Sequence, residues 1–115
     1  MKVAIYGQYY LNSTEPIIKD IFVFFNKNNV EMIIEEHFLD MLYDKKIVQK
    51  AYKTFSSHTE LDSSFDMMIS IGGDGTILRA ATLVRNSGIP ILGVNAGRLG
   101  FLASVPKENI DTFLQ

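Results

Sequence analysis

The residue best placed for chemistry is Asp74, which stands among three glycines, Gly72, Gly73 and Gly75. Glycine has no Cβ, so the backbone here can take positive φ angles and lets a bulky anion approach its N–H groups closely. A carboxylate beside such an anion is repelled unless a cation or a reacting hydroxyl lies between them. The loop therefore predicts phosphate binding together with phosphoryl chemistry or Mg²⁺. The alternative is a tight turn in which Asp74 only caps the next helix.

Two elements must position this loop. The short apolar run 67–71 is typical of a buried strand, and a helix is expected from about Thr76 to Asn86. The free N–H groups and positive dipole end of that helix favour a phosphate at its start. Arg79 lies one turn into the helix, where its guanidinium either binds a phosphate or is solvated, and the sequence leaves both open. The stripe expected to face the core is Ile77, Ala80, Ala81 and Val84.

A second glycine-rich segment, 95–102, follows another short apolar run at 90–94. Two such segments, each directly after a buried strand, are expected at the same edge of a parallel sheet when the connections are right-handed crossovers. Phe101 in the second segment either stacks on a ring of a ligand or is buried in the core. The pattern predicts one site built from both segments.

The rest of the chain alternates strand-like and helix-like segments. Strands are predicted at 2–7 and 30–35, and a helix is predicted from Thr14 to about Asn28, with Ile18, Ile21, Phe22 and Phe25 on its buried face. Residues 37–55 are rich in helix formers, with Ile47, Val48, Ala51, Tyr52 and Phe55 on one face. The charged triplet 44–46 interrupts that pattern as a solvated turn or exposed helix face. The loop 8–13 either lines a site at the sheet edge or packs against the rest of the protein. Residues 56–64 are expected to form a polar loop, and a last helix is expected after Pro106.

This alternation predicts the α/β class, with a three-layer α/β/α Rossmann-like domain around a mostly parallel sheet. The 115 residues are 47% apolar, enough for one domain with a core. Because the apolar pattern is still running at Gln115, we expect residues 1–115 to be the N-terminal α/β domain of a longer polypeptide.

Composition narrows the partners. The net charge is −2 with both signs spread along the chain, which gives no electrostatic case for nucleic acid or an anionic membrane. No apolar run reaches transmembrane length, so a cytoplasmic protein is expected. The chain has no cysteine, which excludes disulfides and thiolate metal sites. His37 and His58 are isolated in the sequence, so neither is taken as a metal ligand.

The glycine motifs exclude some nucleotide-binding families and resemble another. No Gly-Lys-Ser/Thr follows at Walker A spacing, and Leu78 stands where the dinucleotide fingerprint needs its third glycine. Residues 72–76 resemble a kinase superfamily that includes NAD kinases, diacylglycerol and sphingosine lipid kinases, and 6-phosphofructokinases. Residues 93–102 look like the NAD kinase pattern G-x-N-x-G-x-L-G-F-L at every fixed position. The chain is thus identified, by resemblance, as an NAD kinase N-terminal domain.

The resemblance implies phosphorylation of the 2′-hydroxyl of the adenosine ribose in NAD, giving NADP, with ATP or polyphosphate as donor and a divalent metal ion such as Mg²⁺. It assigns Asp74 as the catalytic aspartate. It also implies a β-rich C-terminal NAD-binding domain outside these residues, a homo-oligomer, and little activity in residues 1–115 alone. The alternatives to an NAD kinase are a related lipid or sugar-phosphate kinase and a non-catalytic nucleotide-binding regulatory domain. The positions that the resemblance assigns to nucleotide binding are Gly72, Gly73, Gly75, Thr76, Leu78, Arg79, Asn95 and Phe101.

Overall fold

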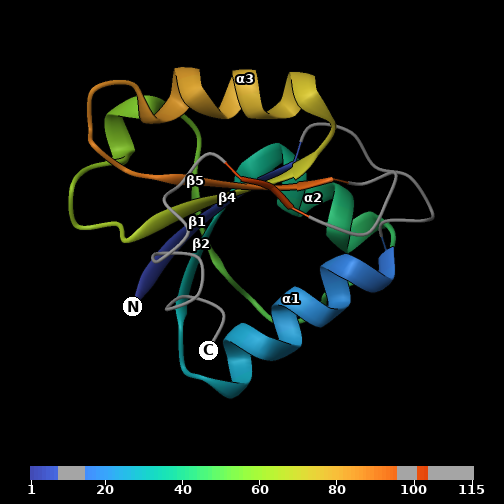
Figure 1. Cartoon of the computed structure of the whole chain (residues 1–115). Coiled ribbons are helices and arrows are strands. Elements are labelled where there is room, and N and C mark those ends of the chain that lie inside the picture. The colour runs from blue at the N-terminus through green and yellow to red at the C-terminus, as the bar shows by residue number, and fades with distance from the viewer. Residues whose placement is uncertain (8–14, 96–100, 104–115) are drawn as a thin grey trace.

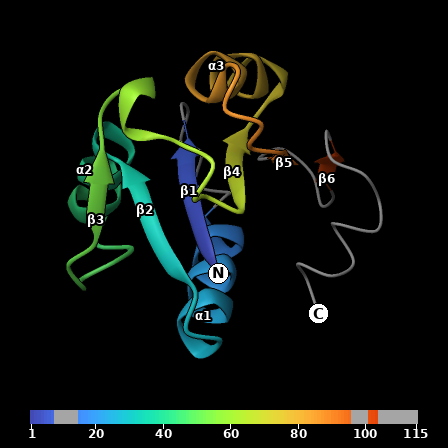
Figure 2. The ribbon, with the colours of Figure 1, turned by 90° about the vertical axis from the view of Figure 1, so that its left-hand side faces the viewer.

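The computed structural model describes residues 1–7, 15–95 and 101–103, which form a six-stranded sheet with helices on both faces (Figure 1). Across the sheet the strands run in the order β3-β2-β1-β4-β5-β6 (Figure 2). The first five strands are parallel, and β6 pairs antiparallel with β5. The predicted mostly parallel α/β sheet is confirmed. The strands are β1 Lys2–Gly7, β2 Glu31–Glu35, β3 Lys53–Phe55, β4 Met67–Gly72, β5 Ile91–Asn95 and β6 Phe101–Ala103.

Helices α1 (Glu15–Lys27) and α2 (Glu36–Asp44) lie on one face of the sheet, and α3 (Asp74–Val84) lies on the other (Figure 1). Successive strand residues point to opposite faces, so a strand covered on both sides is apolar throughout. Val3 and Ile5 accordingly belong to the cluster under α1 and α2, whereas Ala4 and Met68 belong to the cluster under α3. Two apolar clusters separated by one sheet give the three-layer, Rossmann-like arrangement that the sequence predicts.

The first two helices end in the same way. At the end of α1, Asn29 has a φ of 57°, and the N–H of Val30 donates to the carbonyl of Phe25 at 2.9 Å. At the end of α2, Lys46 has a φ of 57°, and the N–H of Ile47 donates to the carbonyl of Leu42 at 2.9 Å. A residue in the left-handed conformation, followed by a hydrogen bond from the next N–H back to the carbonyl five residues earlier, is the Schellman motif that ends a helix.

The end of α2 at Asp44 shows that one prediction is wrong. The helix expected over 37–55 ends at Asp44, and the chain then turns towards β3, where Phe55 is buried in the cluster on the α3 face of the sheet and not on a helix face. Helix-forming composition is overridden because residues 53–55 pair in parallel with β2. The solvated-turn interpretation of residues 44–46 is confirmed. The polar connection after β3 contains one 3₁₀ turn, η2 (His58–Glu60).

The buried face of α3 also differs from the predicted one. Ala80 and Val84 are buried as expected, but Ala81 is exposed and Thr76 is buried instead. The helix begins two residues earlier than predicted, at Asp74, and Thr76 packs against Gly72 at the end of β4. That contact turns the face containing Thr76 towards the sheet.

Three expectations lie outside the described residues: the loop 8–13, the glycine segment 96–100 and the helix after Pro106. In the part of the chain that the structure describes, no helix is both long and apolar enough to cross a membrane.

Candidate functional site

The carboxyl ends of β4 and β5 meet at one edge of the sheet. Gly72, the last residue of β4, lies opposite Asn95, the last residue of β5, in the parallel register. On the other side of β4, Ile71 lies opposite Gly7, the last residue of β1. The two glycine segments therefore start from neighbouring strand ends, as predicted from their positions in the sequence.

Strand order places this edge at a point where the direction of winding reverses. From β1 the chain proceeds outward through β2 and β3, and then returns to the other side of β1 to form β4 and β5. In open α/β sheets, ligands bind in the crevice outside the strand ends at such a switch point. Gly7 and Gly72, which end the two strands flanking the switch, both lie there.

The loop after β4 enters α3 with little capping by side chains. The N-cap residue is Gly73, with φ −100° and ψ −165°, and Asp74 is the first helical residue. The capping position proposed for Asp74 as an alternative thus belongs to Gly73. Within the first turn, the N–H of Thr76 donates to the carbonyl of Gly73 at 3.1 Å. No side chain of a described residue caps this end of the helix, and the first N–H groups of a helix have no partner in the helix itself.

The three glycines of the loop have different surroundings. A Cβ built on Gly72, whose φ is +156°, would lie 2.2 Å from Oγ1 of the buried Thr76. By contrast, a Cβ on Gly73 or Gly75 meets no atom within 4 Å. Gly72 is therefore required by packing inside the protein, whereas Gly73 and Gly75 leave open space beside the backbone. A ligand approaching the main chain has that space available.

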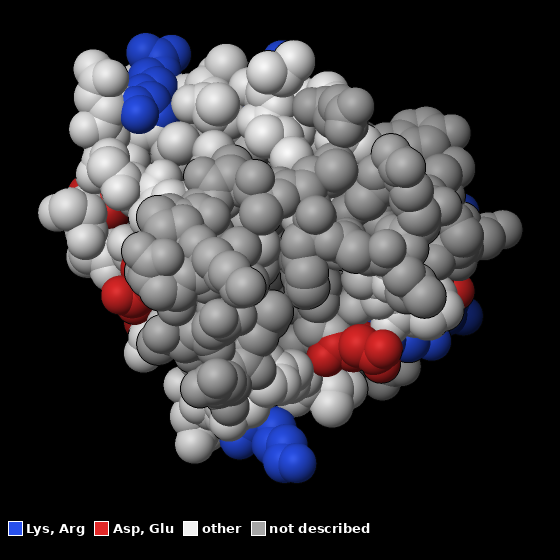
Figure 3. All heavy atoms as spheres, viewed as in Figure 1, with Lys and Arg blue, Asp and Glu red and all other residues white. Residues whose placement is uncertain are grey.

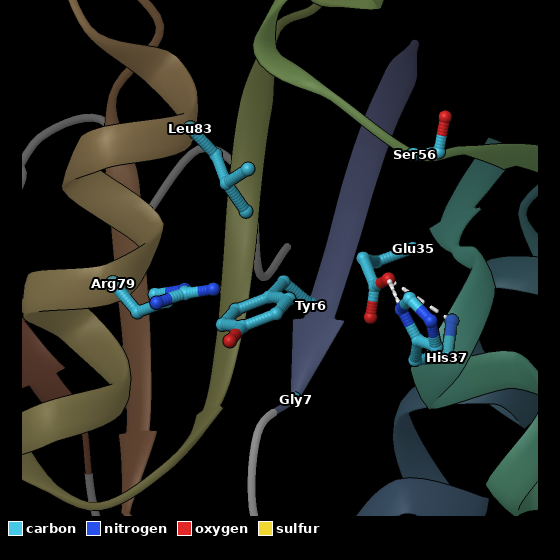
Figure 4. Close-up of a pocket in the computed structure, with 7 residues that line it drawn as sticks. All are labelled: Tyr6, Gly7, Glu35, His37, Ser56, Arg79 and Leu83. Carbon is cyan, nitrogen blue, oxygen red and sulfur yellow. Dashed lines mark hydrogen bonds and ion pairs between the residues drawn. The ribbon is translucent and has the colours of Figure 1, made fainter.

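Two side chains of α3 lie near this loop. Leu78 is 71% exposed, so its surface is accessible to a ligand. Arg79 extends towards Tyr6 of β1 and lines a pocket (Figure 4). The sequence left Arg79 open between a ligand-binding role and plain solvation; in the structure the residue is exposed and lines the pocket, which is compatible with both.

The pocket lined by Arg79 has a volume of about 300 Å³ and lies over the carboxyl ends of β1 and β2. Its walls come from five elements or connections, which are far apart in the sequence (Figure 4). The lining residues are Tyr6, Gly7, Glu35, His37, Ser56, Arg79 and Leu83.

Glu35 is the buried charged group of this pocket, with 7% of its surface exposed. It is the N-cap of α2: its Oε1 accepts from the N–H of Phe38 at 3.1 Å, and its Oε2 accepts from the N–H of His37 at 3.0 Å. Oε2 also contacts Nδ1 of His37 at 2.9 Å. A carboxylate at an N-cap is stabilised by the helix dipole, which offsets part of the cost of burying it.

Tyr6 stands between the two charged groups of the pocket. Burial raises the pKa of the Tyr6 phenol, the Arg79 guanidinium opposes that rise, and the Glu35 carboxylate adds to it. The net direction is upward, so the phenol is neutral at pH 7 and offers one O–H donor and acceptor lone pairs.

Sequence reasoning missed Tyr6, Glu35, His37 and Ser56. Glu35 carried a usable signal, because an acidic residue at the end of the second strand of a Rossmann-like unit commonly contacts a ribose. The side chains of Asp74, Asn95 and Phe101 lie outside the described part; Phe101 starts β6, which pairs with Val94 of β5.

Charged side chains of the described residues are scattered in both signs around the face shown in Figure 3. Among the described residues, no group of three or more His, Cys, Asp or Glu side chains could hold a metal ion.

Comparison with known proteins gives a consistent result. Residues 11–115 match the model of a family described as the ATP-NAD kinase N-terminal domain. An NAD kinase of Flavobacterium johnsoniae is 76% identical over 115 residues, and one of Flavobacterium psychrophilum is 63% identical over the same length. An NAD kinase of Christiangramia forsetii is 45% identical over 115 residues. In each case the whole of this chain is covered, and it spans 39% of the length of the relative.

Proposed function

The chain belongs to the family of ATP-NAD kinase N-terminal domains, and from this premise we propose that it supplies the nucleotide-binding and catalytic loops of an NAD kinase. The proposed reaction transfers a phosphoryl group from ATP to the 2′-hydroxyl of the adenosine ribose of NAD, giving NADP and ADP. The family match separates the chain from the lipid and sugar-phosphate kinases that the first glycine motif alone left open.

The observation that carries the proposal is the alignment of Gly72 with Asn95 at the switch-point edge of the sheet. It brings the start of both family motifs to one place, next to the N-terminus of α3. A helix N-terminus with free N–H groups and open space beside Gly73 and Gly75 suits a phosphate group. Phosphoryl transfer needs such positioning and charge stabilisation more than it needs a strong base.

In the proposed mechanism, Asp74 engages the 2′-hydroxyl of NAD. The hydroxyl oxygen forms a bond to the terminal phosphorus of ATP, the bond from that phosphorus to the ADP oxygen breaks, and the hydroxyl proton leaves to Asp74 or to water. An aspartate with an ordinary pKa of about 4 is a weak base at pH 7, so aligning the hydroxyl is its main contribution. The nucleotide-binding positions are those named above from Gly72 to Arg79, with Asn95 and Phe101.

Further parts of the proposal concern groups outside the described residues. Mg²⁺ commonly binds substrate phosphates together with one or two carboxylates, so it would enter with ATP, and Asp74 is the carboxylate at the loop. A β-rich C-terminal domain would complete the NAD site, and a homo-oligomer and a cytoplasmic location belong to the same proposal. The chain's 39% share of its relatives' length is consistent with a two-domain enzyme.

The test is an assay of NADP formation from NAD, ATP and Mg²⁺. The full-length protein that contains this chain is expected to be active, and residues 1–115 alone are expected to be inactive or nearly so. Activity of residues 1–115 at the full-length rate would refute the shared site. No activity in the full-length protein would favour a non-catalytic regulatory domain.

The same assay tests Asp74. In the full-length protein, Asp74→Asn is expected to lower kcat by orders of magnitude while the melting temperature stays within about 2 °C. Asp20→Asn, an exposed aspartate on α1 across the sheet, serves as the matched control and should keep wild-type kcat. A collapse of the melting temperature in Asp74→Asn would instead assign Asp74 a structural role.

A further inference from the structure

The pocket around Glu35 lies beside the glycine loop but is built mainly from other elements. Its floor is the end of β1 and β2, one wall is Arg79 and Leu83, one turn apart on α3, and the other is Ser56 after β3 (Figure 4). Helix α3 covers the β4 side of this face, and α1 and α2 lie on the opposite face (Figure 1). The pocket therefore lies where the switch in winding leaves the ends of β1 and β2 without a helix above them.

Glu35 is held in a fixed position, with one acceptor site to spare. Its Oε2 is occupied by the N–H and Nδ1 of His37, and its Oε1 accepts from the N–H of Phe38. An ionised carboxylate has about four acceptor positions, so Oε1 retains one that no described residue fills. Figure 4 shows this second oxygen turned away from His37. A buried carboxylate whose acceptor position is left free by the described residues selects a ligand that donates a hydrogen bond, such as a hydroxyl, and repels an anion.

The opposite end of the pocket has the opposite chemistry. Arg79 makes no ion pair with any carboxylate whose side chain the structure describes, and its guanidinium faces the neutral phenol of Tyr6. An arginine in this state suits a phosphate, which it can bind in a bidentate manner. Arg79 lies five residues beyond Asp74 on α3, so this end of the pocket is also the end that leads to the glycine loop.

A ligand that donates hydroxyls at one end and presents an anion at the other is a ribose phosphate. We propose that the pocket binds the ribose of the phosphoryl-donor nucleotide, with Glu35 accepting a hydrogen bond from a ribose hydroxyl and Arg79 facing the phosphates. The identification of the nucleotide as the phosphoryl donor rests on the proposed function. The recognition of a ribose rests on the pocket residues Glu35, Tyr6 and Arg79. Polyphosphate has no ribose hydroxyl for Glu35 to bind, so Glu35 would contribute nothing to its binding.

The experiment measures binding and not turnover, on the full-length protein with Mg²⁺ and without NAD. Calorimetric titrations compare ATP, 2′-deoxy-ATP and 3′-deoxy-ATP. The loss of one hydrogen bond to a buried carboxylate is expected to weaken binding of at least one deoxy analogue by a factor of about 10 to 100. Equal affinities for all three nucleotides in the wild type would overturn the proposal without any variant.

Variants then locate the effect. Glu35→Gln is expected to weaken ATP binding and to reduce the preference over the deoxy analogue to less than about threefold, since its amide is a weaker acceptor. Glu35→Asp keeps both the charge and a good N-cap residue but withdraws the carboxylate from the pocket, so it should lose the preference while staying folded. The matched control, Glu36→Gln, removes an exposed charge one residue along and should keep it. A wild-type preference in both Glu35 variants would overturn the proposal.

The NADP assay separates this inference from the proposed function. If the enzyme forms NADP, Glu35→Gln should raise KM for ATP while KM for NAD stays unchanged. A ribose preference that depends on Glu35, in a protein that forms no NADP, would support the ribose pocket and refute the kinase. NADP formation without any ribose preference would do the reverse.

Discussion

Replacing Gly72 with alanine tests whether packing inside the protein shapes the loop. The new Cβ would lie 2.2 Å from Oγ1 of Thr76, about 1.2 Å short of the 3.4 Å at which ordinary contact begins. Thr76 has little room to move, since it is 4% exposed and lies in the first turn of α3, against the sheet. The φ of +156° adds backbone strain for any residue with a Cβ.

The expected cost follows from these two causes. Overpacking in a dense region costs about 1–3 kcal/mol, and an unfavourable φ costs about 1–3 kcal/mol, so Gly72→Ala should destabilise the protein by about 2–6 kcal/mol. The measurement is thermal and urea unfolding of the full-length protein, in which a fall in melting temperature of at least about 4 °C is expected.

Gly73→Ala is the matched control, because its Cβ meets no atom within 4 Å and its φ is −100°. We expect that change to stay within about 0.5 kcal/mol. In a Thr76→Ala background the clash with Oγ1 disappears, so Gly72→Ala should cost less there than in the wild type. Equal destabilisation by Gly72→Ala and Gly73→Ala, or no coupling with Thr76, would refute this account of the loop.

Two further predictions concern stability. The hydroxyl of Ser70 is buried in β4 without a hydrogen-bond partner among the described residues, so Ser70→Ala should raise the free energy of unfolding by about 1 kcal/mol; a lower urea midpoint would contradict this. The N–H and hydroxyl of Ser56 hold the pKa of Glu60 below its ordinary 4.5, so this contribution is full above pH 4.5 and is lost as the pH falls through the folded-state pKa. Glu60→Gln should therefore flatten the fall of the melting temperature below about pH 5, and an unchanged acid slope would exclude the interaction.

Local sequence determined most of the elements and their layering. The strands at 2–7, 31–35 and 67–72 are short apolar runs closed by a glycine or a charge, and α1 follows a 3.6-residue stripe with an asparagine stop. These signals lie within a few residues of one another, so one sequence is enough to detect them. The glycine motifs likewise predicted which strand ends meet, because parallel strands bring their carboxyl ends to one edge.

Local sequence failed where a distant partner decided the conformation. Residues 47–55 have helix-forming composition, but 53–55 form a strand that pairs with β2, and 47–52 are an irregular connection to it. Ala81 fits a helical stripe as well as Thr76 does, but α3 turns Thr76 towards Gly72 of β4, and Ala80 and Val84 pack in the cluster on the same face. In both cases the conformation is stabilised by contacts with a residue on another strand or helix, which the local sequence does not show.

The two parts of the candidate site differ in the same way. The glycine loop is contiguous, so phosphate chemistry there could be proposed from the types and spacing of residues 72–79 alone. The neighbouring pocket joins Tyr6, Glu35 and Arg79 from β1, β2 and α3, and nothing in their separation along the chain marks them as neighbours. Only the strand order, with β1 between β2 and β4, brings a buried carboxylate and an arginine to either side of one tyrosine.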